Sequence, residues 1–216
     1  MATTRIGLLS DIHGNAVALN AVLDDMGPVD ALVCAGDVVG YGPSPETCLA
    51  AVRDRAVPTV AGNHDRAVVD GLTWEPGDEY ARRVLSAPDI EWLGDLPREL
   101  RLFDGRLKAV HDHPDERDRY TDPADFAPTL LGDEDVLVLG HTHIQHAEAF
   151  DAGLVVNPGS VGQPRDGDPD AAYAVLDLSD LSVDLRRVSY DVDRVRQRVA
   201  ETPIPDRNGA RLAPDQ

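Results

Sequence analysis

The chain has 216 residues, of which 39 are Asp or Glu and 20 are Lys or Arg, so its formal net charge is −19. This length suits one domain with a substantial buried core, and no stretch is apolar for long enough to span a membrane. The negative charge disfavours a stable nucleic-acid partner, because nucleic acids are bound by basic faces. It is typical of a protein from a salt-rich cytosol, where salt screens the self-repulsion of an acidic surface.

The beginning of the chain and its two cysteines favour the cytoplasm. Residues 1–5 lead directly into an apolar run, which leaves no room for a signal peptide. Cys34 lies in an apolar run and Cys48 in an expected helix, so both are predicted to be small core residues in a reducing compartment. Two cysteines in unrelated settings also exclude a zinc site built from thiolates.

The first half of the chain alternates between predicted strands and helices. Short apolar runs rich in Val and Leu, closed by Gly or a polar turn, indicate buried strands. Ser44 followed by Pro45 is typical of a helix start. The expected elements of this half are strands at 6–9, 31–35 and 57–60, and helices at 15–25, 45–53 and within 65–94.

The second half consists mostly of predicted strands. Asp104-Gly105 separates two apolar runs and predicts a tight hairpin. Residues 1–202 are expected to form a single domain that ends in a helix over 190–200, and residues 203–216 a flexible acidic tail. Strand–helix alternation followed by strand-rich sequence predicts an α/β fold. The expected strands of this half are 100–103, 106–110, 136–139, 147–150, 154–157, 172–178 and 183–188.

Five apolar runs are followed by residues of the kinds that bind metals, and these segments contain five of the seven histidines. Side chains at the carboxyl ends of strands can converge on one crevice. Spacings of two residues, on an extended backbone, would point both side chains of a pair to the same side. Each motif alone is also compatible with ordinary turn residues, but the five together predict one metal centre. The segments are Asp11-Ile12-His13, Gly36-Asp37, Gly62-Asn63-His64-Asp65, Val110-His111 and Gly140-His141-Thr142-His143.

The order of these motifs resembles that of the calcineurin-like metallophosphoesterase superfamily, from Asp11 to His143. The longer segments 36–43 and 157–165 look like the small, single-domain, prokaryotic phosphodiesterase branch. The resemblance implies a four-layer α/β/β/α sandwich of two mixed sheets flanked by helices. Two positions depart from the family pattern: Asp112 stands where relatives often have Gly, and Gly40 stands where many carry a second Asp.

The same resemblance implies two divalent metal ions. Asp37 would bridge them, because a carboxylate has one oxygen for each ion. A nitrogen and oxygen shell suits Mn²⁺, Fe, Zn²⁺ or Ni²⁺, and Mn²⁺ is expected for a small prokaryotic member. The implied ligands are Asp11, His13, Asp37 and His143 for one ion, and Asp37, Asn63, His111 and His141 for the other.

Other polar residues of these motifs are candidates for catalysis or substrate binding. His64 is expected to face the open side of the site, where it would stabilise the transition state or protonate the leaving oxygen. Asp65 would either orient His64 or cap a helix, and both interpretations stay open. Tyr41 and Arg165 are expected to rim the crevice, where Arg165 would bind a phosphate or form surface ion pairs. His113 is expected in a solvated loop.

The expected function is hydrolysis of a small or extended phosphodiester by in-line attack of a hydroxide that bridges two ions. The chain lacks inserted capping segments, so the crevice should be open, and His146 should lie on an edge strand away from it. One alternative is a protein-interaction scaffold of the same fold, but such scaffolds have substituted key histidines that are present here. Another is a dinucleotide polyphosphate hydrolase or a nuclease. The natural substrate depends on loops that the motifs do not specify.

Overall fold

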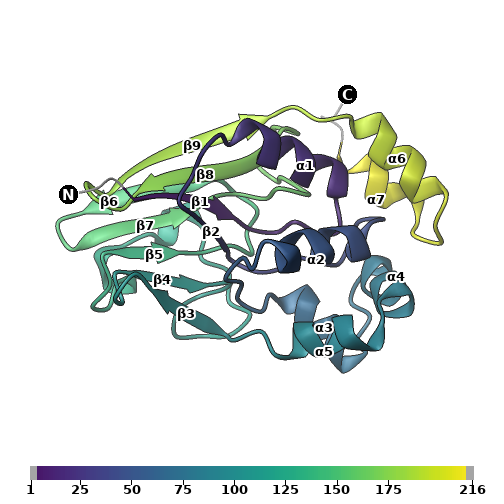
Figure 1. Cartoon of the computed structure of the whole chain (residues 1–216), viewed down its shortest axis with the longest axis horizontal. Helices are drawn as coiled ribbons and strands as arrows, with labels where there is room; N and C mark the ends of the chain where they lie inside the picture. Colours follow the sequence, from purple (N-terminus) through teal and green to yellow (C-terminus); the bar gives the residue numbers. More distant parts are fainter. Residues whose placement is uncertain (1–3, 213–216) are drawn as a thin grey trace.

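The computed structural model describes residues 4–212 and contains two mixed β-sheets packed face to face (Figure 1). The four-stranded sheet has the order β2-β1-β8-β9, and the five-stranded sheet has the order β3-β4-β5-β7-β6. In the four-stranded sheet only β1 and β2 are parallel, and the β1–β8 and β8–β9 pairs are antiparallel. In the five-stranded sheet the central pairs β4–β5 and β5–β7 are parallel, and both outer strands are antiparallel. The strands are β1 (Arg5–Leu9), β2 (Ala31–Cys34), β3 (Glu99–Leu102), β4 (Leu107–Val110), β5 (Val136–Val138), β6 (His146–Phe150), β7 (Gly153–Asn157), β8 (Ala171–Asp177) and β9 (Ser182–Val188).

Helices cover the outer faces of both sheets, which confirms the predicted sandwich. In Figure 1, α3, α4 and α5 lie together beside α2, beyond the ends of the strands. Two short 3₁₀ helices, η1 and η2, cover the five-stranded sheet, whereas α-helices cover the four-stranded sheet. The helices are α1 (Ala16–Asp25), α2 (Pro45–Asp54), α3 (Asn63–Asp70), α4 (Pro76–Val84), α5 (Ala87–Gly94), η1 (Pro123–Asp125), η2 (Pro128–Leu130), α6 (Val192–Ala200) and α7 (Asp206–Ala210).

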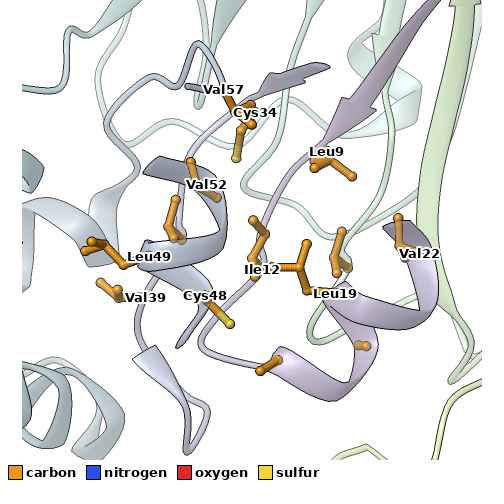
Figure 2. Close-up of a cluster of buried hydrophobic side chains, with 14 of the residues drawn as sticks. Leu9, Ile12, Leu19, Val22, Cys34, Val39, Cys48, Leu49, Val52 and Val57 are labelled. Carbon is orange, nitrogen blue, oxygen red and sulfur yellow. The ribbon is translucent and has the colours of Figure 1, made fainter. Parts of the chain in front are cut away.

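The alternation of side chains along β1 divides the core into two parts. Ile6 and Leu8 point into the space between the sheets, whereas Leu9 faces the helices, where it packs near α1 and α2 (Figure 2). Gly7 faces α1, and a Cβ atom there would lie 2.3 Å from Met26 Sδ. The glycine therefore allows α1 to pack closely on the strand that leads into the candidate metal site.

The predicted strands and helices are present, with small differences at their ends. Residues 57–60 form only an isolated bridge between Thr59 and Cys34 instead of a strand. The hairpin loop is longer than the Asp104-Gly105 pair, because Leu102 pairs with Leu107. No helix within residues 4–212 is long and apolar enough to cross a membrane.

The segment after α6 corrects the prediction of a flexible tail. It forms α7, and the side chains of Ile204 and Leu212 are buried. The Asn208 side-chain amide donates a hydrogen bond to the Tyr41 carbonyl at 3.1 Å, so this segment contacts a loop of the candidate site. Because the segment is mostly polar, the sequence analysis did not predict that Ile204 and Leu212, which flank α7, are buried. Residues 213–216 of the expected tail lie outside the described residues.

Candidate metal centre

The loops that follow β1, β2, β4 and β5 meet at one place. The Asp11 amide donates to the Gly36 carbonyl at 2.9 Å, and the Gly140 amide donates to the His111 carbonyl at 3.0 Å. A third bond joins the two sheets, because the His141 amide donates to Asp11 Oδ2 at 3.0 Å. Backbone hydrogen bonds between loops therefore bring together motifs that are far apart in the sequence.

The loop backbone at the predicted ligands is left-handed, which corrects the expectation of an extended chain. β1 ends at Leu9, and Asp11 and His13 have φ values of 52° and 48°. His141 and His143 repeat the conformation with φ values of 69° and 60°. Asp and His are among the residues that enter this region most readily. The side chains of each pair consequently reach the site through tight turns.

The first group of candidate ligands consists of Asp11, His13 and His143. Asp11 Oδ1 lies 3.2 Å from His143 Nε2 and 3.6 Å from His13 Nε2. The two imidazole nitrogens are 2.9 Å apart. All three side chains are buried, so a cation held here would be shielded from solvent.

The second group lies around His111. Its Nε2 atom is 3.3 Å from Asp37 Oδ2 and 3.0 Å from Asn63 Oδ1. The His141 ring centroid is 5.0 Å from that of His111. Asp37 Oδ1 accepts the His64 amide at 2.8 Å, so Oδ2 is the oxygen without a hydrogen bond. Asp37 Oδ2 would therefore be free to contact a cation.

Three of the imidazoles are oriented by the main chain. A carbonyl oxygen can only accept a hydrogen bond, so the Nδ1 atom that faces it carries the proton. When the Nε2 atom of such a ring loses its proton, its lone pair faces the place where a metal would bind. The pairs are His13 Nδ1 with Val39 O at 3.1 Å, His111 Nδ1 with Ala35 O at 2.7 Å, and His143 Nδ1 with Gln163 O at 2.6 Å.

Three buried polar atoms at this place have no hydrogen-bond partner among the described residues: Asp11 Oδ1, Asp37 Oδ2 and His141 Nε2. Buried polar groups in proteins are nearly always paired, so these atoms need a partner that the protein does not supply. Carboxylate oxygens and imidazole nitrogens are suitable ligands for a divalent transition metal. The predicted ligands therefore fit a metal centre.

The charges of the centre also favour a bound cation. Burial would raise the pKa of Asp37, but the nearby His111 and His64 hold it well below its usual range. Burial would lower the pKa of His111, but the negative charge of the adjacent Asp37 raises this pKa to about 10. The buried carboxylates therefore stay ionised and require positive charge beside them.

His64 is oriented by Asp78, a residue that the sequence analysis missed. His64 Nδ1 lies 2.7 Å from Asp78 Oδ1, and Asp78 is fully buried at the start of α4. The other carboxylate oxygen of Asp78 accepts the Glu75 amide at 2.9 Å. Burial lowers the pKa of His64, but the charge of Asp37 and the bond to Asp78 produce a net rise. The pair therefore favours the protonated imidazole.

The glycine at position 40 is the feature of the sequence from which a carboxylate elsewhere in the chain, such as Asp78, could have been expected beside His64. A Cβ atom at Gly40 would lie 2.9 Å from His64 Cβ and 3.1 Å from Asp78 Oδ1. A side chain at residue 40 would therefore enter the space where Asp78 meets His64. Asp78 supplies a carboxylate beside the position where many relatives carry their second Asp.

Asp65 serves as a helix cap and does not contact His64. Its carboxylate accepts the amides of Asp37 at 2.8 Å, Val39 at 3.2 Å and Gly62 at 3.0 Å. Adjacent residues of a helix point in different directions, which explains why Asp65 does not orient His64. The capping interpretation is thus the correct one, with Asp65 at the third helical position.

Tyr41 and Arg165 come together beside the centre, as expected. The Tyr41 ring lies 4.8 Å from the His13 ring and 4.6 Å from the His64 ring, measured between centroids. Arg165 Nη2 donates to the Tyr41 hydroxyl at 3.2 Å and to Gln163 Oε1 at 2.9 Å. None of the ion pairs within residues 4–212 includes Arg165, so the expectation of surface ion pairs is wrong.

The remaining two histidines lie outside the ligand clusters. His113 was expected to be solvated but is buried, and its Nδ1 accepts the Asp115 amide at 3.2 Å. His146 lies on the edge strand β6, as predicted, where it packs against Phe126 with 5.0 Å between ring centroids. Asp112 is also buried, and its Oδ2 accepts the Asp118 amide at 2.6 Å.

Two buried groups of Asp and His that could hold a metal thus lie in the loops that follow the strands of two packed mixed sheets. The model of the calcineurin-like phosphoesterase superfamily domain matches residues 4–181, and the chain belongs to this family. Because the family is a class of hydrolases, the expected enzyme class is confirmed.

Proteins similar to this chain include bacterial and archaeal ones. Phosphodiesterase YfcE of Escherichia coli is 36% identical over 194 residues, covering 83% of this chain and 90% of YfcE. An uncharacterized protein of Methanocaldococcus jannaschii is 29% identical over 98% of both chains. The crystal structure of a metallophosphoesterase from Sphaerobacter thermophilus has a TM-score of 0.85 and 32% identity, with 99% of each chain covered.

Proposed function

We propose that this protein is a metal-dependent phosphodiesterase that hydrolyses small phosphodiesters. The observation that carries the proposal is the set of unpartnered buried atoms on Asp11, Asp37 and His141, which converge on one place. The similarity to YfcE, which is named a phosphodiesterase, supports a diester substrate.

The residues that would hold two divalent ions are those of the sequence prediction. The nitrogen and oxygen shell suits Mn²⁺, Fe, Zn²⁺ or Ni²⁺ alike, and Mn²⁺ is the proposed metal because the chain resembles the small prokaryotic branch of the family. When bound, such ions lower the pKa of a coordinated water molecule and neutralise charge on the phosphoryl group. The proposed ligands are Asp11, His13, Asp37, Asn63, His111, His141 and His143.

His64 and Asp78 form the proton-transfer pair of the proposal. Asp78 holds His64 by Nδ1, so Nε2 is the atom that is free to donate a proton to the leaving oxygen. Asp78 acts here as a positioning residue, and Asp65 supports the loops through its three backbone contacts. Arg165, which is exposed and rests on Tyr41, is placed to bind a non-bridging phosphate oxygen.

The acidic surface favours a diester over a monoester. The chain carries a formal net charge of −19, and at neutral pH a phosphodiester carries about one negative charge whereas a monoester carries nearly two. A polynucleotide has one charge per residue and would be repelled most strongly. A salt-rich cytosol is the proposed location, and screening by salt there weakens this discrimination by charge without reversing it.

The alternative functions have less support. A scaffold role does not explain why Asp11 Oδ1, Asp37 Oδ2 and His141 Nε2 are buried without a hydrogen-bond partner, because unpaired buried polar atoms destabilise a fold. The strong negative charge likewise counts against a nuclease. Hydrolysis of a dinucleotide polyphosphate would use the same site, so this alternative differs from the proposed function only in its substrate.

The test is hydrolysis of bis(4-nitrophenyl) phosphate and of 4-nitrophenyl phosphate by metal-free protein reloaded with Mn²⁺. We expect the diester to be hydrolysed faster, and His141→Ala to lose most of the activity. His146→Ala is the matched control, because it removes a histidine on β6 outside the ligand clusters. Diester turnover no faster than a protein-free blank with Mn²⁺, Fe²⁺, Zn²⁺ or Ni²⁺ would refute the proposal.

A further inference from the structure

Two exposed aromatic side chains lie against histidines of the centre. The described residues contain four exposed large hydrophobic side chains, and Trp74 and Tyr120 are the aromatic ones, each 51% exposed. The Tyr120 ring stacks on His141, with 4.1 Å between centroids and 18° between planes. The Trp74 ring meets His64 edge to face, with 6.3 Å between centroids. The other two side chains are Leu72, in the same loop as Trp74, and Leu185 on β9.

The position of Tyr120 is fixed by its loop. The His113 amide donates to the Arg119 carbonyl at 3.1 Å, which closes the loop that follows His111 just before Tyr120. An ion pair between Arg66 of α3 and Asp118 attaches this loop to the helix. The ring is therefore held with one face on His141 while half of its surface stays open to solvent.

Trp74 is placed by the same helix. It lies in the short connection between α3, which begins with Asn63 and His64, and α4, which carries Asp78. The loop containing Tyr120 is attached to α3 through Arg66. Both aromatic rings thus belong to segments attached to α3. Each ring packs against a different histidine of the site, Trp74 against His64 and Tyr120 against His141.

Resting on the phosphodiesterase function proposed above, we infer that Trp74 and Tyr120 form a stacking subsite for a planar ring of the substrate, and that the substrate is a small nucleoside phosphodiester. Stacking on Trp or Tyr is available to every nucleobase and strengthens binding about five- to 150-fold per base. It suits this protein because stacking does not depend on the positive charge that the surface lacks. It also persists in concentrated salt, where contacts to phosphate weaken.

The test compares two diesters that share a leaving group and a charge, thymidine 5′-(4-nitrophenyl phosphate) and ethyl 4-nitrophenyl phosphate. We expect the wild-type enzyme loaded with Mn²⁺ to show a kcat/KM at least about tenfold higher for the thymidine ester. Trp74→Leu and Tyr120→Leu, which keep apolar bulk but remove the ring, should reduce this preference to below about threefold. Trp74→Phe should restore part of it, and Leu185→Ala, which removes an exposed hydrophobic side chain on β9, should leave it unchanged.

A binding measurement separates this inference from the function on which it rests. Thymidine 5′-monophosphate should quench the fluorescence of Trp74 in the wild-type protein, and the quenching should disappear in Trp74→Leu, where Trp92 still emits. If both esters are hydrolysed and neither leucine variant alters the preference, the stacking subsite is wrong and the phosphodiesterase proposal stands. If neither ester is hydrolysed, the phosphodiesterase proposal fails, and the presence or absence of quenching decides the subsite. If the fluorescence falls with increasing protein concentration and not with increasing nucleotide concentration, the rings contact a second copy of the chain. That result would overturn the inference.

Discussion

Replacing Asp78 with Asn tests whether the carboxylate of α4 is needed for catalysis by His64. The variant keeps an oxygen for the Glu75 amide, which Asp78 caps at 2.9 Å. It places an amide group opposite His64 Nδ1, where a carboxylate oxygen now lies at 2.7 Å. An amide that donates a hydrogen bond to Nδ1 favours the neutral imidazole. The Nε2 proton of a neutral ring is far less acidic than that of the protonated ring, so His64 would be a much weaker proton donor.

The expected loss follows from the strength of this hydrogen bond. A bond to a charged group contributes about 1.5–3 kcal/mol, and each 1.4 kcal/mol changes a rate about tenfold. We therefore expect kcat of Asp78→Asn to fall by about 10- to 150-fold. Metal content should not change, because Asp78 is not among the candidate ligands.

The assay uses diphenyl phosphate and bis(4-nitrophenyl) phosphate, whose leaving groups differ in their need for a proton. The decrease should be larger for the phenyl ester, since a nitrophenolate leaves without help. Asp89→Asn is the matched control, because Asp89 also caps the start of a helix, accepting the Ser86 amide at 3.1 Å, but does not contact a histidine. Equal kcat values for Asp78→Asn and the wild-type protein on both esters would refute the reasoning.

Further predictions concern the metal, the proton donor, the surface and the C-terminal segment. Elemental analysis after loading with Mn²⁺ should find about two ions per chain, and Asp37→Asn should lose more than half of them; full occupancy would contradict the ligand scheme. His64→Ala should keep both ions but lose about 10²–10⁴ in turnover, and a fall in metal content would show that His64 is itself a ligand. The melting temperature should rise between low salt and molar KCl as repulsion within the acidic surface is screened, so a flat curve would contradict the halophilic interpretation. Deleting residues 203–216 should remove about 3–6 kcal/mol of apolar burial and lower the melting temperature by at least about 6 °C; an unchanged value would mean that α7 does not stabilise the fold.

The ligand set could be predicted because all the ligands except Asn63 follow a strand at a short distance along the chain, and Asn63 follows the isolated bridge at Thr59. The apolar runs identify the strands, and the family order of motifs then assigns Asp11, Asp37, His111 and the rest. The local geometry was not predictable in the same way. An Asp or His two residues beyond a strand looks the same in the sequence whether its backbone is extended or left-handed, and the left-handed turns at Asp11 and His13 depend on bonds to a neighbouring loop.

Contacts between distant segments explain what the sequence did not reveal. Asp78 belongs to a capping pattern that predicts only a helix start, and nothing in that pattern indicates that His64 lies beside it. The same holds for α7, where Asn208 contacts Tyr41 across 167 residues of sequence. Buried polar partners of this kind are determined by tertiary packing, so local propensity cannot identify them.

The main-chain carbonyls that orient three imidazoles have a consequence for how this family can change. Carbonyls of Val39, Ala35 and Gln163 are present whatever side chain stands at those positions. Substitutions there can alter packing without removing the hydrogen bond that fixes the ring. The orientation of these three rings therefore tolerates a change of side chain at residues 35, 39 and 163, whereas a change of the ligands themselves does not leave the centre intact.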